Sequence, residues 1–148
     1  MARFDGKVAI VTGSTQGLGE GIATRLAREG ARVVLNGRSR DKGAAVQERL
    51  RGLGVETHFV QADLSRKAEA QGVVAAAIAR FGRLDFLINN AQSQSPHVAA
   101  TDDDAEQFLT ETLYGGLYPT LWTAQAAHPH MCKAGGGRIV NFASINGV

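Results

Sequence analysis

Residues 7–19 read KVAIVTGSTQGLG, and the rest of the chain is interpreted outward from this segment. The apolar β-type run Val8–Val11 ends in a loop with glycines at three positions, and a helical pattern follows directly. Unpaired N–H groups in a first helical turn, together with the helix dipole, favour a bound anion. We expect Gly13 to permit a tight turn, Gly17 to let the backbone approach a phosphate, and Gly19 to let helix and strand pack closely. The alternative is a plain βα turn whose glycines serve packing alone.

Strand-like and helix-like segments alternate through the remainder of the chain. Leu18, Ile22 and Leu26 recur at four-residue spacing, with alanines beside them, and predict the apolar stripe of a helix. Further strands are expected at residues 32–36, 56–61, 84–88 and 138–143, and further helices after the candidate caps Ser39 and Ser65 and, with interruptions, between residues 105 and about 133. This order predicts one α/β domain over residues 1–148, a doubly wound parallel sheet of the Rossmann type, with the less apolar third strand at an edge.

The composition restricts the class of protein. The chain has 148 residues, 44% of them apolar and 20% charged, which is typical of a soluble globular domain. Its longest uncharged apolar stretch is far shorter than the roughly 20 residues that cross a bilayer. The net charge is +2 and the basic residues are scattered, so nucleic acid is not indicated as a partner. A single cysteine and no secretory leader favour the cytoplasm.

The fifth strand predicts a fold that is incomplete in these residues. Ile139, Val140 and Phe142 make that strand apolar on both faces, and such a strand requires neighbours on both sides. A doubly wound dinucleotide fold normally has six strands, and this sequence supplies five. We therefore expect the C-terminal strands and helices of the domain to be missing.

Four segments, in order and in register, resemble the N-terminal part of a short-chain dehydrogenase/reductase. They are TGSTQGLG at residues 12–19, Asp63-Leu64, Asn89-Asn90-Ala91, and GRIVNFASING at residues 137–147. The resemblance covers the whole chain. It implies an NAD(P)-dependent oxidoreductase that transfers hydride between a nicotinamide and a small carbonyl or alcohol substrate.

The resemblance also implies a role for each matching residue. Pyrophosphate and adenosine ribose are expected to bind the loop residues Gly13, Ser14, Thr15, Gln16, Gly17, Leu18 and Gly19. Asp63 would accept a hydrogen bond from the adenine amino group beside Leu64, and Asn89, Asn90 and Ala91 would lie under the ribose. Ser144 matches the family's catalytic serine; its alternative is a polar strand terminus.

Three departures from the family pattern affect catalysis. The family's acid/base tyrosine, with a lysine four residues later, is absent from this sequence, because neither Tyr114 nor Tyr118 has such a lysine. Gln92 stands where the family usually has glycine. The segment around Gly115 and Gly116 replaces an asparagine that anchors a water, so a weakened or rerouted proton relay is expected. We predict that the 148-residue chain alone is inactive.

The end of the second strand indicates the cofactor. Asn36-Gly37-Arg38-Ser39 contains no carboxylate to take a ribose 2′-hydroxyl, whereas Arg38 and Ser39 can bind a 2′-phosphate. NADP(H) is therefore favoured over NAD(H). Two points oppose this: Arg38 can instead stack on the adenine, and Gln16 stands where many NADP-preferring relatives carry a basic residue.

Other features have simpler interpretations. The resemblance implies a homo-oligomer interface on the interrupted helix, because in relatives this helix packs against a partner subunit. Tyr114, Tyr118 and Trp122 lie on it, and core packing is the alternative for these residues. No metal site is expected: His128 and Cys132 share a helix face that His130 does not, and the aspartates at 102–104 suit a helix start. Two alternatives to the enzyme remain, a non-catalytic NADP(H)-binding module and a truncated remnant whose fold a partner completes.

Overall fold

The computed structural model describes residues 2–92, 101 and 103–143. Its elements follow the predicted alternation. In chain order they are β1 (Val8–Val11), α1 (Gly17–Arg28), β2 (Arg32–Gly37), α2 (Arg40–Arg51), β3 (Thr57–Gln61), α3 (Lys67–Phe81), β4 (Phe86–Asn89), α4 (Ala105–Thr112), the π-helical turn η1 (Leu113–Leu117), α5 (Tyr118–Lys133) and β5 (Arg138–Asn141). The second to fifth strands differ from their predicted bounds by one or two residues at their ends.

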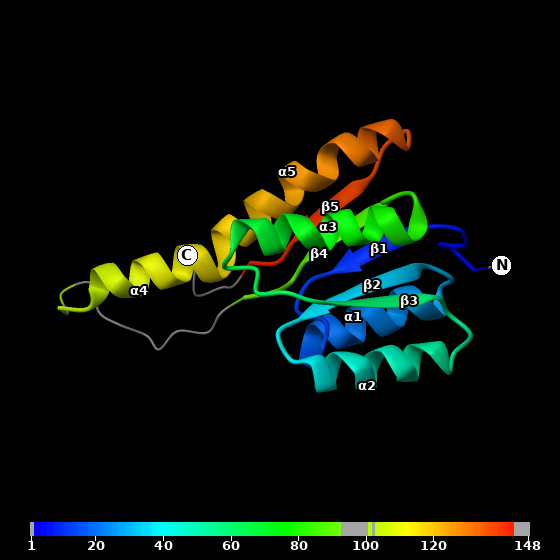
Figure 1. The fold of residues 1–148 in the computed structure, drawn as a ribbon, viewed down its shortest axis with the longest axis horizontal. Helices are drawn as coiled ribbons and strands as arrows, with labels where there is room; N and C mark the ends of the chain where they lie inside the picture. Colours follow the sequence, from blue (N-terminus) through cyan, green and yellow to red (C-terminus); the bar gives the residue numbers. More distant parts are fainter. Residues whose placement is uncertain (1, 93–100, 102, 144–148) are drawn as a thin grey trace.

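The sheet is parallel throughout, with the order β3-β2-β1-β4-β5. Helices α1 and α2 cover one face, and α3 and α5 cover the other (Figure 1). This is the predicted doubly wound arrangement, and β3 lies at an edge, as its weaker apolar pattern indicated. The glycine loop leaves the central strand β1, whose four residues are all buried. The loop therefore follows a strand that is buried along its whole length in the middle of the sheet.

Helix α1 packs on the sheet through small side chains. Its buried residues are Gly19, Ala23 and Ala27, which recur every fourth position and face β1 and β2. The prediction that Leu18 belongs to the buried stripe is wrong, since Leu18 is 62% exposed. The face that packs on the sheet runs through Gly19, Ala23 and Ala27, and Leu18, one position before Gly19, lies beside this face at the start of the helix.

Two helix starts differ in how their first amides are bonded. Ser39 caps α2 as predicted, because its hydroxyl accepts a hydrogen bond from the Lys42 amide at 3.4 Å. Ser65 does not cap α3, which begins after Arg66. The Ser65 hydroxyl instead donates to Asp63 at 2.8 Å. A local Asx-type turn has therefore taken the side chain that a cap would have used.

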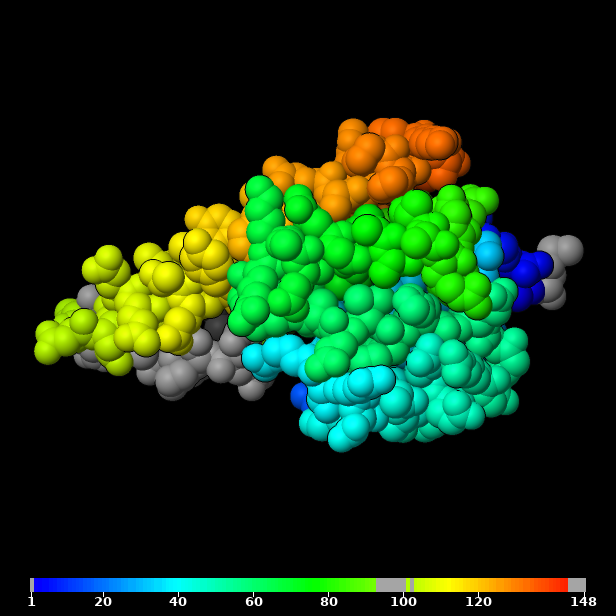
Figure 2. All heavy atoms as spheres, in the orientation of Figure 1, coloured from blue at the N-terminus to red at the C-terminus, as the bar shows by residue number. Residues whose placement is uncertain are grey.

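The predicted interruption of the long helix is a π-turn. The chain passes from α4 through η1, which contains Gly115 and Gly116, into α5 with Pro119 at its start. Proline has no N–H, so the carbonyl that would accept from position 119 loses its helical donor. Helix α4 extends beyond the end of the sheet (Figure 1), and in Figure 2 its atoms, in yellow, project as an arm. No helix in the described ranges has the length and hydropathy that crossing a membrane would require.

Strand β5 forms the second edge of the described sheet. Ile139 and Val140 are 39% and 44% exposed, and Phe142, just beyond the strand, is 37% exposed. On α4, η1 and α5, the side chains of Leu109, Leu117 and Leu121 also reach solvent in the described structure. Apolar surface is thus concentrated on the C-terminal part of the chain.

Candidate cofactor site

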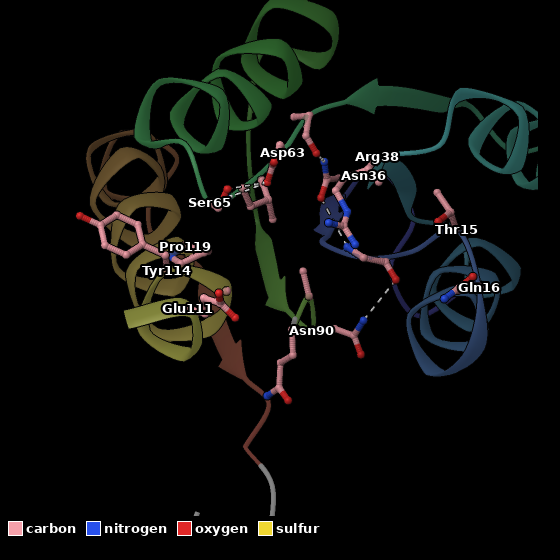
Figure 3. Close-up of a pocket in the computed structure, with 17 residues that line it drawn as sticks. Thr15, Gln16, Asn36, Arg38, Asp63, Ser65, Asn90, Glu111, Tyr114 and Pro119 are labelled. Atoms are coloured by element: carbon pink, nitrogen blue, oxygen red, sulfur yellow. Dashed lines mark hydrogen bonds between the residues drawn. The ribbon is translucent and has the colours of Figure 1, made fainter. Parts of the chain in front are cut away.

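A cavity of about 880 Å³ opens at the carboxyl ends of the strands. Figure 3 shows Thr15 and Gln16 on one side of it, Glu111, Tyr114 and Pro119 on the other, and Asp63 with Ser65 above. Its lining comes from the ends of β1, β2, β3 and β4 and from the α4–η1 region. Ligands of doubly wound sheets bind at this edge, beside the strand where the order reverses. Here that strand is β1, which carries the glycine loop.

Glycine is required at the three positions of the loop for different structural reasons. Gly13 and Gly17 have φ of +62° and +57°, in the left-handed region that other residues rarely adopt. Around Gly17 a Cβ would find open space, so the backbone there is accessible to a ligand. At Gly19 a Cβ would overlap the Gly13 carbonyl and lie 2.5 Å from Asn90 Nδ2. Gly19 is thus a packing residue, as expected.

Hydrogen bonds fasten the glycine loop to the end of β4. The Thr12 hydroxyl accepts from the amides of Asn90 and Ala91, both at 3.0 Å, and donates to the Ile88 carbonyl at 3.3 Å. In return, Asn90 Nδ2 donates to the carbonyls of Thr12 at 3.0 Å and Gly13 at 3.3 Å. We call this set of bonds the Thr12–Asn90 clasp. It fixes the position of the loop relative to a strand that is distant in sequence.

Asn36 fastens the glycine loop to β2, on the side opposite β4. Its role was not identified from the sequence. Its Oδ1 accepts from the Gly13 amide at 3.4 Å, and its Nδ2 donates to the carbonyls of Val60 and Ala62. Its backbone exchanges hydrogen bonds with Ser14, which is fully buried. The available signal was an amide side chain in a strand that is otherwise buried and apolar. Ser14 therefore holds the loop to β2 and does not line the cavity.

The remaining predicted residues divide into two groups. Those that line the cavity are Gly13, Thr15, Gln16, Arg38, Asp63, Leu64, Asn90 and Ala91. Those outside the lining are Ser14, Gly17, Leu18, Gly19, Ser39 and Asn89. Asn89 is buried, and its side chain bonds Asn141 at 3.0 Å and Thr123 at 2.8 Å, which joins β4 to β5 and α5. The proposed catalytic Ser144 lies outside the described residues.

Asp63 presents an ionised acceptor to the cavity. The Ser65 hydroxyl donates to its Oδ1 at 2.8 Å and the Ser65 amide at 3.1 Å. These bonds, with the positive charges of Arg38 and Arg66, outweigh burial and hold the pKa of Asp63 below its usual value. At neutral pH the carboxylate is therefore charged and can accept a hydrogen bond from an amino group of a ligand.

Two of the departures from the family pattern lie at the other end of the cavity. Gly115 lines it and has no side chain to hold a water. Gln92 also lines it, and its Nε2 donates to the carbonyl of Phe142 at 3.0 Å. That bond ties the chain leaving β4 to the chain leaving β5, a contact that a glycine at position 92 would not make.

A family model described as short chain dehydrogenase matches residues 7–148. The chain belongs to the short-chain dehydrogenase family. It is 40% identical to 1,6-dihydroxycyclohexa-2,4-diene-1-carboxylate dehydrogenase of Acinetobacter baylyi over 97% of this chain and 54% of that protein. It is 37% identical to D-beta-hydroxybutyrate dehydrogenase of Cupriavidus necator over 98% of this chain and 55% of that protein. The chain thus spans about half the length of these curated relatives.

Solved structures of the family share the fold. An NAD⁺-bound xylitol dehydrogenase superposes with a TM-score of 0.91 at 31% identity, over 98% of this chain and 55% of its own. A 7α-hydroxysteroid dehydrogenase in complex with NADH and 7-oxo glycochenodeoxycholic acid superposes with a TM-score of 0.90 at 30% identity, over 97% of this chain and 55% of its own.

Within the described ranges, no three His, Cys, Asp or Glu side chains gather in a way that would hold a metal ion.

Proposed function

We propose that this chain is the cofactor-binding portion of an NAD(P)-dependent oxidoreductase acting on a small carbonyl or alcohol substrate. The observation that carries the proposal is the clasped glycine loop at the start of α1, with open space at Gly17 and the cavity beside it. Its relatives are named as dehydrogenases, and two structural neighbours hold NAD⁺ or NADH. Backbone amides at a helix start suit a pyrophosphate.

Each part of the site would have one task. The nicotinamide, when bound, supplies or accepts the hydride. Amides of the loop from Gly13 to Gly19 would bind the pyrophosphate, and the Asp63 carboxylate would accept from the adenine amino group. Ser144 would donate a hydrogen bond to the substrate oxygen. The proton relay would be weakened or rerouted, because Gly115 and Gly116 offer only backbone groups where the family usually has an asparagine.

We further propose that NADP(H) is preferred. The β2 end offers no carboxylate, and Arg38, which lines the cavity, is held at its carbonyl by Gln61 Nε2 at 3.0 Å. A guanidinium can bind a 2′-phosphate through two charge-assisted hydrogen bonds. The nicotinamide-bound neighbours carry NAD⁺ and NADH, so NAD(H) is the competing cofactor.

A second candidate is a nucleotide-binding module without catalysis, or a remnant that a partner completes. We propose it for the 148 residues acting alone, in which neither Tyr114 nor Tyr118 has a lysine four residues later. We also propose that the protein is a homo-oligomer in the cytoplasm. The aromatic cluster supports the oligomer, since Tyr118 and Trp122 stack with centroids 5.4 Å apart and Tyr114, exposed on η1, lies against Tyr118.

The test is a titration of the purified protein with NADPH and NADH, followed by nicotinamide fluorescence, after its intact mass has been measured. We expect NADPH to bind more tightly, and Arg38→Gln to reduce that preference by at least about tenfold. Arg51→Gln is the matched control, because Arg51 ends α2 far from the cavity lining. Failure of both nucleotides to bind would refute the proposal. Binding without turnover on a panel of carbonyl substrates would favour the module.

A further inference from the structure

Lys42 reaches from the first turn of α2 to the glycine loop. Its Nζ donates to Gln16 Oε1 at 2.8 Å, across 26 residues of sequence. Gln16 lines the cavity, so the ammonium group lies beside the site although it belongs to a helix outside the lining. The lysine is thereby placed next to the loop position where the sequence lacks a basic residue.

The hydrogen bond to Gln16 does not neutralise the positive charge of Lys42. An amide oxygen is a neutral acceptor, and an ammonium has three donors, so two remain for another ligand. In the part of the chain that the structure describes, the ion pairs do not include Lys42. Glu20, the carboxylate nearest in sequence to Gln16 on the α1 side, is instead paired with Arg49.

The surroundings favour a doubly charged anion. Arg38 contributes a guanidinium from the end of β2, and Ser39 and Lys42 belong to the start of α2, a helix of 12 residues. The dipole of such a helix adds partial positive charge at its N-terminus. The segment 38–42 carries three basic residues and one acidic residue. A phosphate at this corner would meet positive charge from the strand end, the helix start and the lysine held by the loop.

We propose that Lys42, stationed by Gln16, is a second cationic specificity residue for the phosphate on the adenosine 2′-position. The inference rests on the proposed function and deepens it. Arg38 would bind the phosphate from the β2 side as a planar fork, whereas Lys42 would act from the α2 side as a point charge. Gln16 would then position the Lys42 side chain through its hydrogen bond. The neutral side chain at position 16 would therefore be compatible with a preference for NADP(H).

The test compares nucleotides that differ only in the 2′-phosphate. Wild type, Lys42→Met and Gln16→Ala are titrated with NADPH and NADH, and 2′-AMP and 5′-AMP are used as fragments. Lys42→Met keeps the aliphatic length and removes the charge. Lys67→Met is the matched control, because Lys67 is an exposed lysine in the first turn of α3. Thermal unfolding of each variant verifies that the fold is retained.

We expect Lys42→Met to weaken NADPH and 2′-AMP by about fivefold to tenfold and to leave NADH and 5′-AMP within about twofold. Gln16→Ala should weaken the 2′-phosphate ligands by about twofold to threefold. The salt dependence of NADPH binding should become shallower in Lys42→Met. Equal effects of Lys42→Met and Lys67→Met on NADPH, or equal losses for NADPH and NADH, would overturn the inference. If the wild type prefers NADPH and Lys42→Met binds NADPH with the same affinity, this inference alone is wrong. If the wild type binds neither nucleotide, the proposed function is refuted together with the inference.

Discussion

Replacing Gly19 by alanine adds a methyl group at the point where α1, the glycine loop and the end of β4 meet. The new Cβ would overlap the Gly13 carbonyl and lie 2.5 Å from Asn90 Nδ2. Neither neighbour is the free end of a flexible chain, since one is backbone and the other is held in the Thr12–Asn90 clasp. The structure must therefore shift the loop or release the Asn90 side chain.

The cost follows from these contacts. Overpacking a tight site costs about 1–3 kcal/mol, and each lost bond of the Asn90 amide about 0.5–1.5 kcal/mol. Alanine recovers up to about 1 kcal/mol of helix propensity. The middle of these ranges is a net loss of about 2–3 kcal/mol in the free energy of unfolding. Gly21→Ala is the matched control: Gly21 is exposed in the same helix with open space at its Cβ, so it should gain about 0.5–1 kcal/mol.

Urea denaturation at pH 7, followed by circular dichroism, measures both variants. We expect the midpoint of Gly19→Ala to fall below that of wild type and the midpoint of Gly21→Ala to rise above it. Nucleotide affinity should also fall in Gly19→Ala, because the loop moves. If Gly19→Ala unfolds at the same urea concentration as Gly21→Ala, the packing role assigned to Gly19 is wrong.

Three further predictions concern the loop, the cofactor and acid stability. Thr12→Val should lose about 2–4 kcal/mol of stability in urea, because two amides of the clasp lose their acceptor, and Thr12→Ser should restore most of it. Gly37→Asp should shift the preference toward NADH in nucleotide titrations, but a Cβ there lies 2.8 Å from Thr15 Oγ1, so the change belongs in a Thr15→Gly background with Thr15→Gly alone as control. Although burial opposes it, bonding to an arginine and to the Val8 amide lowers the pKa of Asp85; its stabilisation is therefore present above the unfolded-state pKa and is lost as pH falls through the folded-state value. Asp85→Ala should cost about 1–3 kcal/mol at pH 7 and flatten the dependence of stability on pH below about 4, as measured by urea denaturation at several pH values.

The parts of the fold that were predictable from sequence depend on local signals. A strand buried on both faces in a parallel sheet has a continuous apolar run, and Val8–Val11 and residues 33–35 have such runs. The mixed pattern of residues 56–61 indicated an edge strand for the same reason. Gly82 ends α3 in the left-handed conformation that favours glycine. In these cases the residue type and its immediate neighbours determine the outcome.

The parts that were not predictable depend on competition between alternatives of similar local strength. Leu18 shares its helical spacing with one apolar stripe, but the stripe through Ala23 is the one that lets α1 approach the sheet. Ser65 has the chemistry of a cap and also that of an Asx-turn partner, and the carboxylate of Asp63 takes it. Local periodicity and propensity do not decide between such options; packing against distant segments does.

The long-range contacts within the site could also not be predicted from the sequence. The proximity of Lys42 to Gln16, and of Gly37 to Thr15, depends on the pairing of β1 with β2, which brings the two strand ends together. Asn36 was visible only as part of a cofactor-preference motif, yet it joins three segments of the cavity wall. The residue types of the site were thus predictable, whereas the partner of each side chain was not.

The Thr12–Asn90 clasp has a consequence for the order of events during synthesis. Part of what shapes the glycine loop lies 78 residues downstream of it. When β1, α1 and β2 have left the ribosome, the nascent chain contains the glycine loop. It does not yet contain the Asn90 and Ala91 amides that donate hydrogen bonds to the Thr12 hydroxyl. Ligand capture would therefore begin only after Asn90 has emerged and β4 has docked beside β1, and a bound nucleotide would report that this slow, non-local pairing is complete.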